Sequence, residues 1–530
     1  MLLGSWFLRF SSLSAIASLG LILSGCNEVS RNSDAVPASS DQINSSSTHS
    51  TLSEDPQSEF NTEAYDHIEE NPFLLAKTNP LSTFSVDVDT ASYANLRRYL
   101  NNDQLPTAGA VRIEELINYF EYNYPPPSGA EPFSVHVEVA QCPWAEGHQL
   151  AKIGLKGLEI EYQDRPLSNL VFLLDVSGSM QDANKLPLVK SAMKLMLEQL
   201  GENDRIAICV YAGASGLVLP STGADHKTEI FSKLDELAAG GPTNGGEGIE
   251  LAYRVAEENF ITGGVNRVIL CTDGDFNVGM SSQSALVDLI QHKAKSGVFL
   301  SVLGFGTGNL KDSTMEKLAD KGNGNYAYID TMNEAEKVLV EQMSGTLITI
   351  AKDVKIQVDF NPAHIQSYRL IGYENRMLRD EDFLDDSKDA GEIGAGHTVT
   401  ALYELLPVGI ESQPDAVEPS KYQETQELSA LADSDELLTV RLRYKDPDGI
   451  DSQPLSMPVK KQDTPFEEAS TDFQFASAVA AFGMLLRDSR NSGTMTLERV
   501  SEIAEKNLGT DRHGYRQEFL QLVQKAKQLN

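Results

Sequence analysis

The chain has few of the residues that zinc and redox centres use. Its 530 residues include 4 cysteines and 9 histidines. No two cysteines have the CxxC spacing, and the histidines are scattered without the spacing of metal ligands. Besides Cys26 there are Cys142, Cys209 and Cys271, and the last two lie in apolar runs, where cysteine behaves as a small buried hydrophobic residue. The sequence therefore predicts no disulfide framework and no zinc or redox centre.

Positive charge is also scarce. The chain has 43 Lys and Arg residues against 77 Asp and Glu residues, for a formal net charge of -34. Such a surface repels a phosphate backbone, so we expect no nucleic-acid partner. The acidity does not name a partner, because it is equally compatible with high solubility or a saline habitat.

The apolar run at the N-terminus is too short to span a membrane stably. It extends from Leu13 to Leu23, and the basic residue Arg9 precedes it. The small residues Ser24, Gly25 and Cys26 follow. A basic residue, an apolar run and then small residues are the three parts of a secretory signal peptide, in this order. The segment Leu23-Ser24-Gly25-Cys26 resembles the lipobox of bacterial lipoproteins; a plain signal peptide with a chance cysteine is the alternative. The resemblance implies that Cys26 is lipidated and anchors the mature chain. Asn27 in place of Asp implies the outer membrane under the sorting rule of such lipoproteins.

The remaining length predicts three to four folded units. Residues 27–70 are rich in Ser, Asn, Asp and Thr and cannot bury enough apolar surface to fold, so we expect a tether. Residues 71–131 combine one alternating stretch with two helical patterns and predict a small α/β module. Residues 466–530 are helical in pattern, with Phe475, Val479, Phe482 and Leu486 on one apolar face.

Two kinds of strand pattern occupy the middle of the chain. Residues 132–165 and 351–465 alternate apolar and polar residues, as in FSVHVEVA and VKIQVDF, which predicts a β-sandwich. Residues 166–350 instead hold nearly continuous apolar strands, such as NLVFLLDV and RVILCTDG, separated by helical stretches. That order indicates an α/β fold with a doubly wound, mostly parallel sheet covered on both faces. We therefore expect this domain to be inserted into the sandwich.

Oxygen-bearing side chains follow the ends of these apolar strands. Asp175, Ser177 and Ser179 alternate directly after the first strand, at the edge where open α/β sheets bind their ligands. Thr243 lies in the glycine-rich stretch GGPTNGGEGIE, and Asp273 ends another strand. The five residues, in this order, resemble the metal-ion-dependent adhesion site of von Willebrand factor type A domains. Hydroxyl and carboxylate oxygens are hard ligands, which suit Mg²⁺ best and also Mn²⁺ or Ca²⁺.

The flanking segments extend the resemblance. TFSVDVDTASYANLRRYL, VRIEELINYFEYNYP and the helical C-terminus are similar to a bacterial group of von Willebrand A lipoproteins with an N-terminal module of their own and a C-terminal domain of unknown function. The resemblance implies that Ser177, Ser179 and Thr243 hold the cation directly, and that Asp175 and Asp273 act largely through water. It also implies a binding protein instead of an enzyme, whose unknown protein partner completes the metal shell with a carboxylate.

Two other functions remain as alternatives. The first is a structural envelope scaffold whose metal site is non-functional. The presence of all five predicted ligands speaks against this alternative, and the other sequence features are compatible with it. A hydrolase is less favoured, because the chain has no GxSxG motif and no second Asp beside Asp175. Asp87 and Asp89 on a predicted strand could suggest a second metal site, but two carboxylates on one strand face are usually exposed, and we expect that here.

Overall fold

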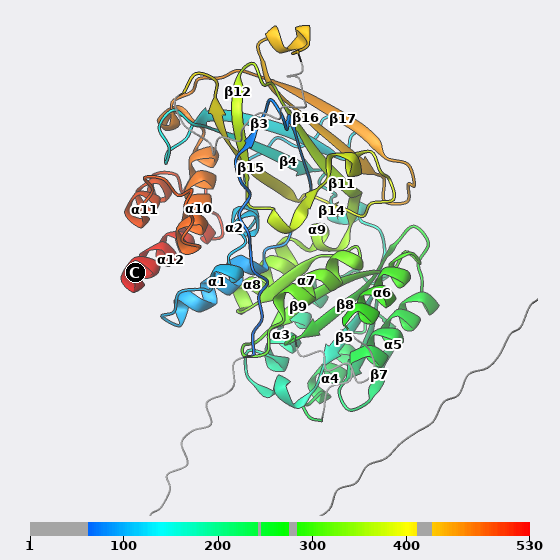
Figure 1. The fold of residues 1–530 in the computed structure, drawn as a ribbon. Helices are drawn as coiled ribbons and strands as arrows, with labels where there is room; N and C mark the ends of the chain where they lie inside the picture. Colours follow the sequence, from blue (N-terminus) through cyan, green and yellow to red (C-terminus); the bar gives the residue numbers. More distant parts are fainter. Residues whose placement is uncertain (1–61, 242–244, 275–282, 411–426) are drawn as a thin grey trace, which may run out of the picture. The chain divides into compact units, whose positions relative to one another are not determined.

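The protein is described here from a computed structural model, which describes residues 62–241, 245–274, 283–410 and 427–530. Three sheets organise these residues: one mostly parallel sheet with helices around it and two antiparallel sheets (Figure 1). Among the described residues, no helix has the length and apolar composition needed to cross a membrane.

The mostly parallel sheet confirms the α/β prediction for the centre of the chain. Its spatial order is β10-β9-β8-β5-β6-β7, and only β7 runs antiparallel to its neighbour. All eight residues of β5 are buried, as a strand covered on both faces requires. The strands are β5 (Ser168–Asp175), β6 (Arg205–Tyr211), β7 (Ser215–Gly223), β8 (Val265–Thr272), β9 (Phe299–Phe305) and β10 (Tyr326–Ile329).

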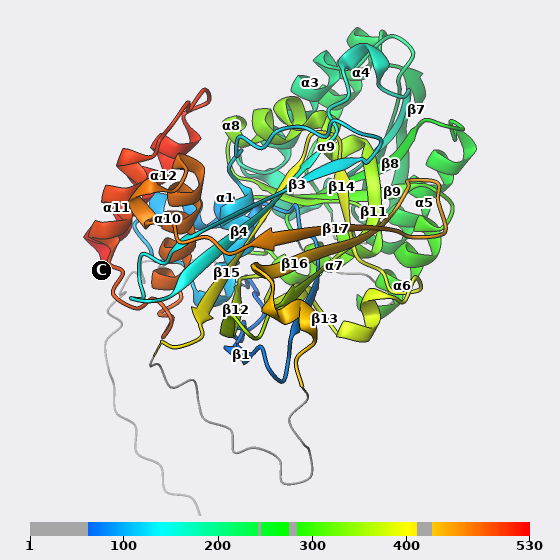
Figure 2. The same ribbon diagram turned by 90° about the horizontal axis from the view of Figure 1, so that it is seen from above.

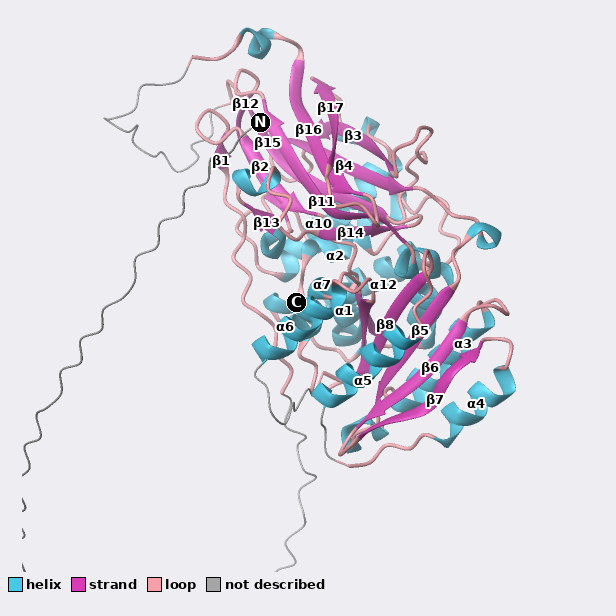
Figure 3. Ribbon diagram, turned by 90° about the vertical axis from the view of Figure 1, so that its right-hand side faces the viewer, coloured by secondary structure: helices cyan, strands magenta, loops and turns pink. Residues whose placement is uncertain are grey.

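Helices cover both faces of this sheet (Figure 3). Leu170, Phe172 and Leu174 of β5 share one buried cluster with α3 (Leu186–Glu198), α4 (Lys227–Glu236) and α8 (Met332–Glu336). Val171 and Leu173 point to the other face and pack with the second group of helices. That group is α5 (Gly245–Glu258), α6 (Gln283–Ala294) and α7 (Asp312–Lys321); α9 (Met343–Leu347) then leads out of the domain.

The two antiparallel sheets contain the strands predicted on either side of the central domain. The first has the order β1-β12-β15-β4-β3, and the second has β13-β2-β11-β16-β17 with β14 paired to β11. Their strands are β1 (Leu74–Leu75), β2 (Leu81–Ser85), β3 (Phe133–Gln141), β4 (Gln149–Gly157), β11 (Thr349–Phe360), β12 (Ile365–Ile371), β13 (Met377–Leu378), β14 (Gly391–Gly394), β15 (Thr398–Pro407), β16 (Glu436–Lys445) and β17 (Gln453–Lys460).

The segment 71–131 has the predicted strands and helices, but its strands form no sheet of their own. The strand β1 pairs with β12, and β2 lies between β11 and β13. A five-residue strand is too short to be stable without neighbours, and the partners of β2 come from much later in the chain. Its helices α1 (Ala91–Asn101) and α2 (Ile113–Asn118) likewise pack on β10 and on the C-terminal helices. The expected separate module is therefore corrected to a segment shared among the other units.

The predicted helical C-terminus is present as α10 (Thr471–Leu486), α11 (Leu497–Lys506) and α12 (Tyr515–Leu529), which lie together beside the antiparallel sheets (Figure 2). Phe475, Val479 and Phe482 are fully buried, as their spacing predicts, and Leu486 is partly buried. The rings of Phe475 and Phe482 pack edge-on against Phe519 of α12, which ties the first helix to the last.

Candidate metal site

Asp175 is held at the end of β5 by groups from both neighbouring strands. Its Oδ1 accepts a hydrogen bond from the Ser177 amide at 2.9 Å. Its Oδ2 accepts bonds from the Tyr211 hydroxyl at 3.1 Å and the Thr272 hydroxyl at 3.3 Å. The side chain is 0% exposed, and burial raises the pKa of Asp175 to about 6. A buried carboxylate of this kind is costly to ionise without a cation, and a bound metal would supply one.

The two predicted serine ligands lie side by side in the loop after Asp175. The Oγ atoms of Ser177 and Ser179 are 3.1 Å apart. The loop is fastened to the stretch that leads to Thr243, because the Gly178 amide donates to the Gly241 carbonyl at 3.0 Å. Thr243 itself lies outside the described residues, so its role as a ligand stays a prediction.

Asp273 follows directly after β8 and is also buried. Its Oδ2 accepts a hydrogen bond from Lys185 Nζ at 3.0 Å and lies 3.4 Å from Asn309 Nδ2. The next residue, Gly274, has a φ of +93°, and a Cβ there would lie 2.6 Å from the Lys311 amide nitrogen. Glycine therefore allows the loop that carries Asn309 to approach Asp273 closely.

The donor set fits a hard divalent cation. Four of the five predicted ligands lie in the described part of the chain, two of them as carboxylates and two as hydroxyls, all at the carboxyl edge of the parallel sheet. The Asp273 carboxylate also contributes to the raised pKa of Asp175, so the two negative charges interact. Sequence reasoning missed Lys185, because it lies in a polar loop with no motif and reaches Asp273 only through the fold.

Comparisons with known proteins identify the family. Residues 169–342 match the family model for the von Willebrand factor type A domain, residues 59–152 match one described as von Willebrand factor, and residues 345–529 match "Uncharacterized protein YfbK, C-terminal". The chain is 43% identical to "Uncharacterized protein YfbK" of Escherichia coli (strain K12) over 88% of its own length and 81% of the relative's. The chain belongs to the YfbK family of von Willebrand factor type A proteins.

The predicted resemblance to von Willebrand factor type A proteins with a C-terminal domain of their own is therefore confirmed. A human inter-alpha-trypsin inhibitor heavy chain H4 is 29% identical over 29% of this chain and 17% of its own. Among solved structures, a von Willebrand factor type A protein from Catenulispora acidiphila covers 74% of this chain and 89% of its own, at 16% identity and a TM-score of 0.40. Type A domains commonly bind a divalent metal and often mediate interactions between proteins.

A second group of carboxylates lies apart from the predicted ligands. Asp87, Glu115 and Glu316 each place one oxygen within 4.8 Å of the others, and all three are buried. The prediction that Asp87 and Asp89 are exposed is thus wrong: both are buried and face Arg376, at 3.2 Å and 3.4 Å.

The guanidinium groups of Arg376 and Arg112 lie between these carboxylates and supply the positive charge that a metal ion would otherwise provide. Arg376 also lies 3.3 Å from Glu316, while Arg112 contacts Glu115 and lies 3.7 Å from Glu316. Buried carboxylates are tolerated when such partners are present. This group is therefore an ion-pair network that joins α2 and α7 to the turn carrying Arg376, and we assign no metal to it.

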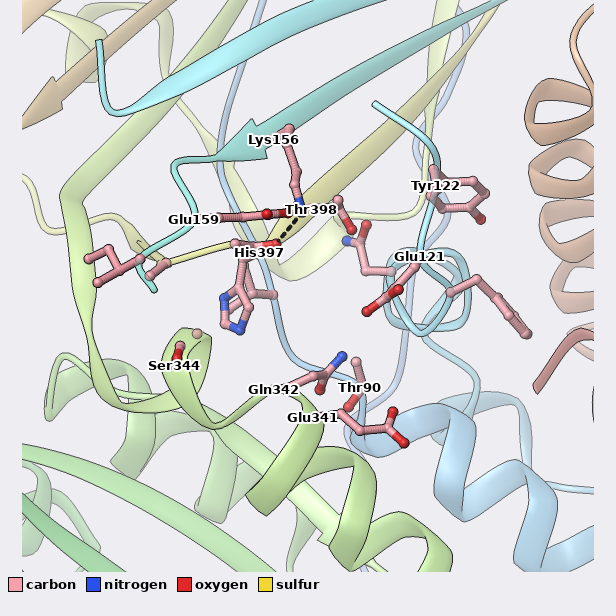
Figure 4. A pocket seen from close by; sticks show the side chains of 17 residues that line it. Thr90, Glu121, Tyr122, Lys156, Glu159, Glu341, Gln342, Ser344, His397 and Thr398 are labelled. Atoms are coloured by element: carbon pink, nitrogen blue, oxygen red, sulfur yellow. Dashed lines mark hydrogen bonds and ion pairs between the residues drawn. The ribbon is translucent and has the colours of Figure 1, made fainter. Parts of the chain in front are cut away.

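A cavity of about 340 Å³ lies where α9 meets β4 and β15 (Figure 4). His397 and Ser344 both line it, so it is the place where a hydrolytic pair could be sought. In the described part of the chain no hydrogen bond joins these two side chains, and His397 Nδ1 has no partner. Burial, reinforced by the charge of Lys156, lowers the pKa of His397 to about 4. The cavity therefore gives no support to the hydrolase alternative.

Proposed function

We propose that this chain is a protein-binding module of the bacterial envelope whose type A domain binds its partner through a divalent cation, most simply Mg²⁺. The observation that carries the proposal is the convergence of Asp175, Ser177, Ser179 and Asp273 at one edge of the parallel sheet, with the stretch leading to Thr243 fastened beside them. Family membership supports the coarser part, a role in protein–protein interaction.

Each proposed ligand has a defined task. Ser177, Ser179 and Thr243 would bind the cation directly through neutral hydroxyl oxygens. The carboxylates of Asp175 and Asp273 would act on the cation largely through water molecules and supply negative charge. Neutral direct ligands leave the cation incompletely neutralised, so an outside carboxylate is attracted to a remaining coordination position. Partner binding would then depend on the metal.

The location in the cell is proposed from the N-terminus. Lipidation at Cys26 would anchor the chain to a membrane. Because the residue after Cys26 is Asn27 and not Asp, the sorting rule of such lipoproteins favours the outer membrane. Cys26 and residues 27–61 of the proposed tether lie outside the described residues. Residues 62–70 are described, and the Thr62 and Ala64 amides are hydrogen-bonded to Gly308 and Leu310 of the folded body, so the predicted tether is corrected to end before Thr62. A surface that binds proteins and is held close to a membrane suits an adhesion or scaffold role.

Removal of a ligand tests the proposal. Asp175→Ala should abolish binding of Mg²⁺ and Mn²⁺ in isothermal titration calorimetry. The wild-type protein should melt at a higher temperature with metal than with chelator, because a ligand that binds only the folded state adds about 2.7 kcal/mol at a hundredfold excess over Kd. The mutant should show no such difference, and capture of partner proteins should be lost with it.

Two further variants protect this test. Asp175→Ala leaves the Tyr211 hydroxyl without its acceptor, so Ser177→Ala serves as a ligand variant with a smaller structural effect. Asp182→Ala is the matched control, because Asp182 is an exposed acid in the same loop and should bind metal like wild type. A wild-type protein that binds no metal would favour the scaffold alternative, and metal binding that survives in both ligand variants would place the cation away from these residues.

A further inference from the structure

Lys185 places a buried positive charge beside the proposed metal ligands. Its side chain is 5% exposed, and its Nζ lies 3.0 Å from Asp273 Oδ2. It is the residue immediately before α3 and makes no side-chain cap for that helix. A cation is unfavourable at a helix N-terminus, where the helix dipole is positive, so the needs of α3 do not explain a lysine here.

The fold provides a slot for this side chain. Gly306, directly after β9, has a φ of +73°, and a Cβ on it would lie 2.4 Å from both Cγ and Cε of Lys185. The Gly306 carbonyl is fixed by a hydrogen bond from the Tyr328 hydroxyl at 2.6 Å. The lysine stem therefore runs over a glycine that is held in place, and the ammonium is directed to Asp273.

The contact between Lys185 and Asp273 changes the net charge of the proposed site, both with and without a bound metal. Asp175 and Asp273 together carry two negative charges, and Lys185 neutralises one of them when no metal is bound. A divalent cation would neutralise both carboxylates, and with Lys185 the loaded site would then carry one net positive charge. Without Lys185 the net charge of the loaded site would be zero, and only the incomplete local neutralisation of the cation by its direct ligands would attract a carboxylate. Charge effects are large here because the three side chains are buried and solvent screens them weakly.

We propose that Lys185 is a built-in counter-ion of the metal site, which weakens metal binding and gives the loaded site the positive charge that attracts a carboxylate of the partner. The inference rests on the proposed function and identifies the partner group by its charge. The ammonium competes with the metal for the Asp273 carboxylate and repels the bound cation. The same repulsion becomes attraction when a negative group approaches the loaded metal.

The test compares Lys185→Met with wild type by using Mn²⁺ alone and then acetate. Methionine keeps the length of the stem and removes the charge. Mn²⁺ should bind about tenfold more tightly to Lys185→Met in calorimetry, since a like charge near the cation is removed. Acetate that displaces water from bound Mn²⁺ lowers the relaxation rate of the water protons. The acetate concentration that produces half of this decrease should be about tenfold higher in Lys185→Met, because the positive charge that attracts acetate is removed.

Matched variants separate charge from folding. Lys185→Gln retains a hydrogen-bond donor without charge and should behave like Lys185→Met, which covers the case in which the methionine variant misfolds. Lys194→Met removes a partly exposed lysine of α3, paired with exposed Asp235 at 2.7 Å, and should match wild type.

The possible results have distinct meanings. If wild type binds Mn²⁺ and both Lys185 variants bind it no more tightly, or their acetate response is unchanged, the role of Lys185 is overturned while the proposed function stands. If neither wild type nor the variants bind Mn²⁺, the proposed function falls and the inference falls with it.

Discussion

Glu114 shows how a single buried carboxylate makes this protein sensitive to pH. It is 0% exposed, its Oε2 accepts a hydrogen bond from the Tyr373 amide at 2.9 Å, and its Oε1 has no hydrogen-bond partner in the described part of the chain. Burial raises the pKa of Glu114 to about 8, and the charges of Glu374, Asp87 and Glu115 act in the same direction. The folded protein therefore holds this carboxyl protonated at neutral pH.

Replacement by glutamine should remove the pH dependence that this group contributes. Below the unfolded pKa of 4.5 both states bind the proton, so Glu114→Gln and wild type should differ little. Between about pH 5 and 8 the unfolded wild-type chain loses the proton while the folded chain keeps it, so wild-type stability falls as pH rises. At pH 9 we expect the variant to be about 5 kcal/mol more stable than wild type in urea unfolding, because each unit of pKa difference between the two states is worth about 1.4 kcal/mol.

Glu69→Gln is the matched control for Glu114→Gln. Glu69 is an exposed glutamate that lines, together with Glu114, a cavity of about 350 Å³ between α2 and α7, so its removal should leave the pH profile unchanged. A constant difference between Glu114→Gln and wild type from pH 5 to pH 9 would contradict the assignment.

At the scale of elements, the segment 62–66 is joined to the loop that borders the proposed metal site. The Thr62 amide donates to the Gly308 carbonyl at 2.7 Å, and the Glu63 carboxylate accepts the Gly308 amide at 2.9 Å. Glu63 also receives two hydrogen bonds from Arg98 of α1, at 3.0 Å and 2.9 Å. The same loop carries Asn309, next to Asp273. The start of the described chain is thus fastened close to the proposed ligands.

Glu63→Ala should loosen this junction. It removes a buried partner of Arg98 and the acceptor of the Gly308 amide, and breaking a buried ion pair costs about 3–5 kcal/mol. Stability should therefore fall by about this amount in urea unfolding, and amide hydrogen exchange in residues 306–311 should become faster. Asp66→Ala, which removes an exposed pair with Lys317 in the same segment, should change stability by less than about 1 kcal/mol. Equal effects of the two substitutions would contradict a specific role for Glu63.

For the whole molecule, the proposed anchor is a single covalent group at the N-terminus. Cys26→Ala should move the protein from the membrane fraction to the soluble fraction after a high-salt wash, because the substitution removes the thiol that the proposed acyl chains would modify. Cys142→Ala is the control, since Cys142 is buried inside the folded body and its removal should leave fractionation unchanged. Persistence of the Cys26→Ala protein in washed membranes would place the anchor elsewhere.

The sequence alone determined the parallel sheet, the family and the C-terminal helices, because their signals are local. Nearly continuous apolar strands mark a sheet covered on both faces, and the two-residue spacing of Asp175, Ser177 and Ser179 is visible within one loop. Two strands gave weaker signals. Both β7 and β17 contain proline, which removes a backbone donor and is found in strands mainly at sheet edges, where these two strands lie.

Only the tertiary structure decided which distant residues meet. The side chains of Thr83 and Gln357 are hydrogen-bonded across 274 positions, so no local pattern could show that β2 belongs to the sandwich. Asp87 is buried because Arg376 reaches it from 289 positions away, and Lys185 joins Asp273 across 88. Burial of a charge is favourable only when its partner is present, and the partner's position depends on chain topology and not on spacing along the sequence.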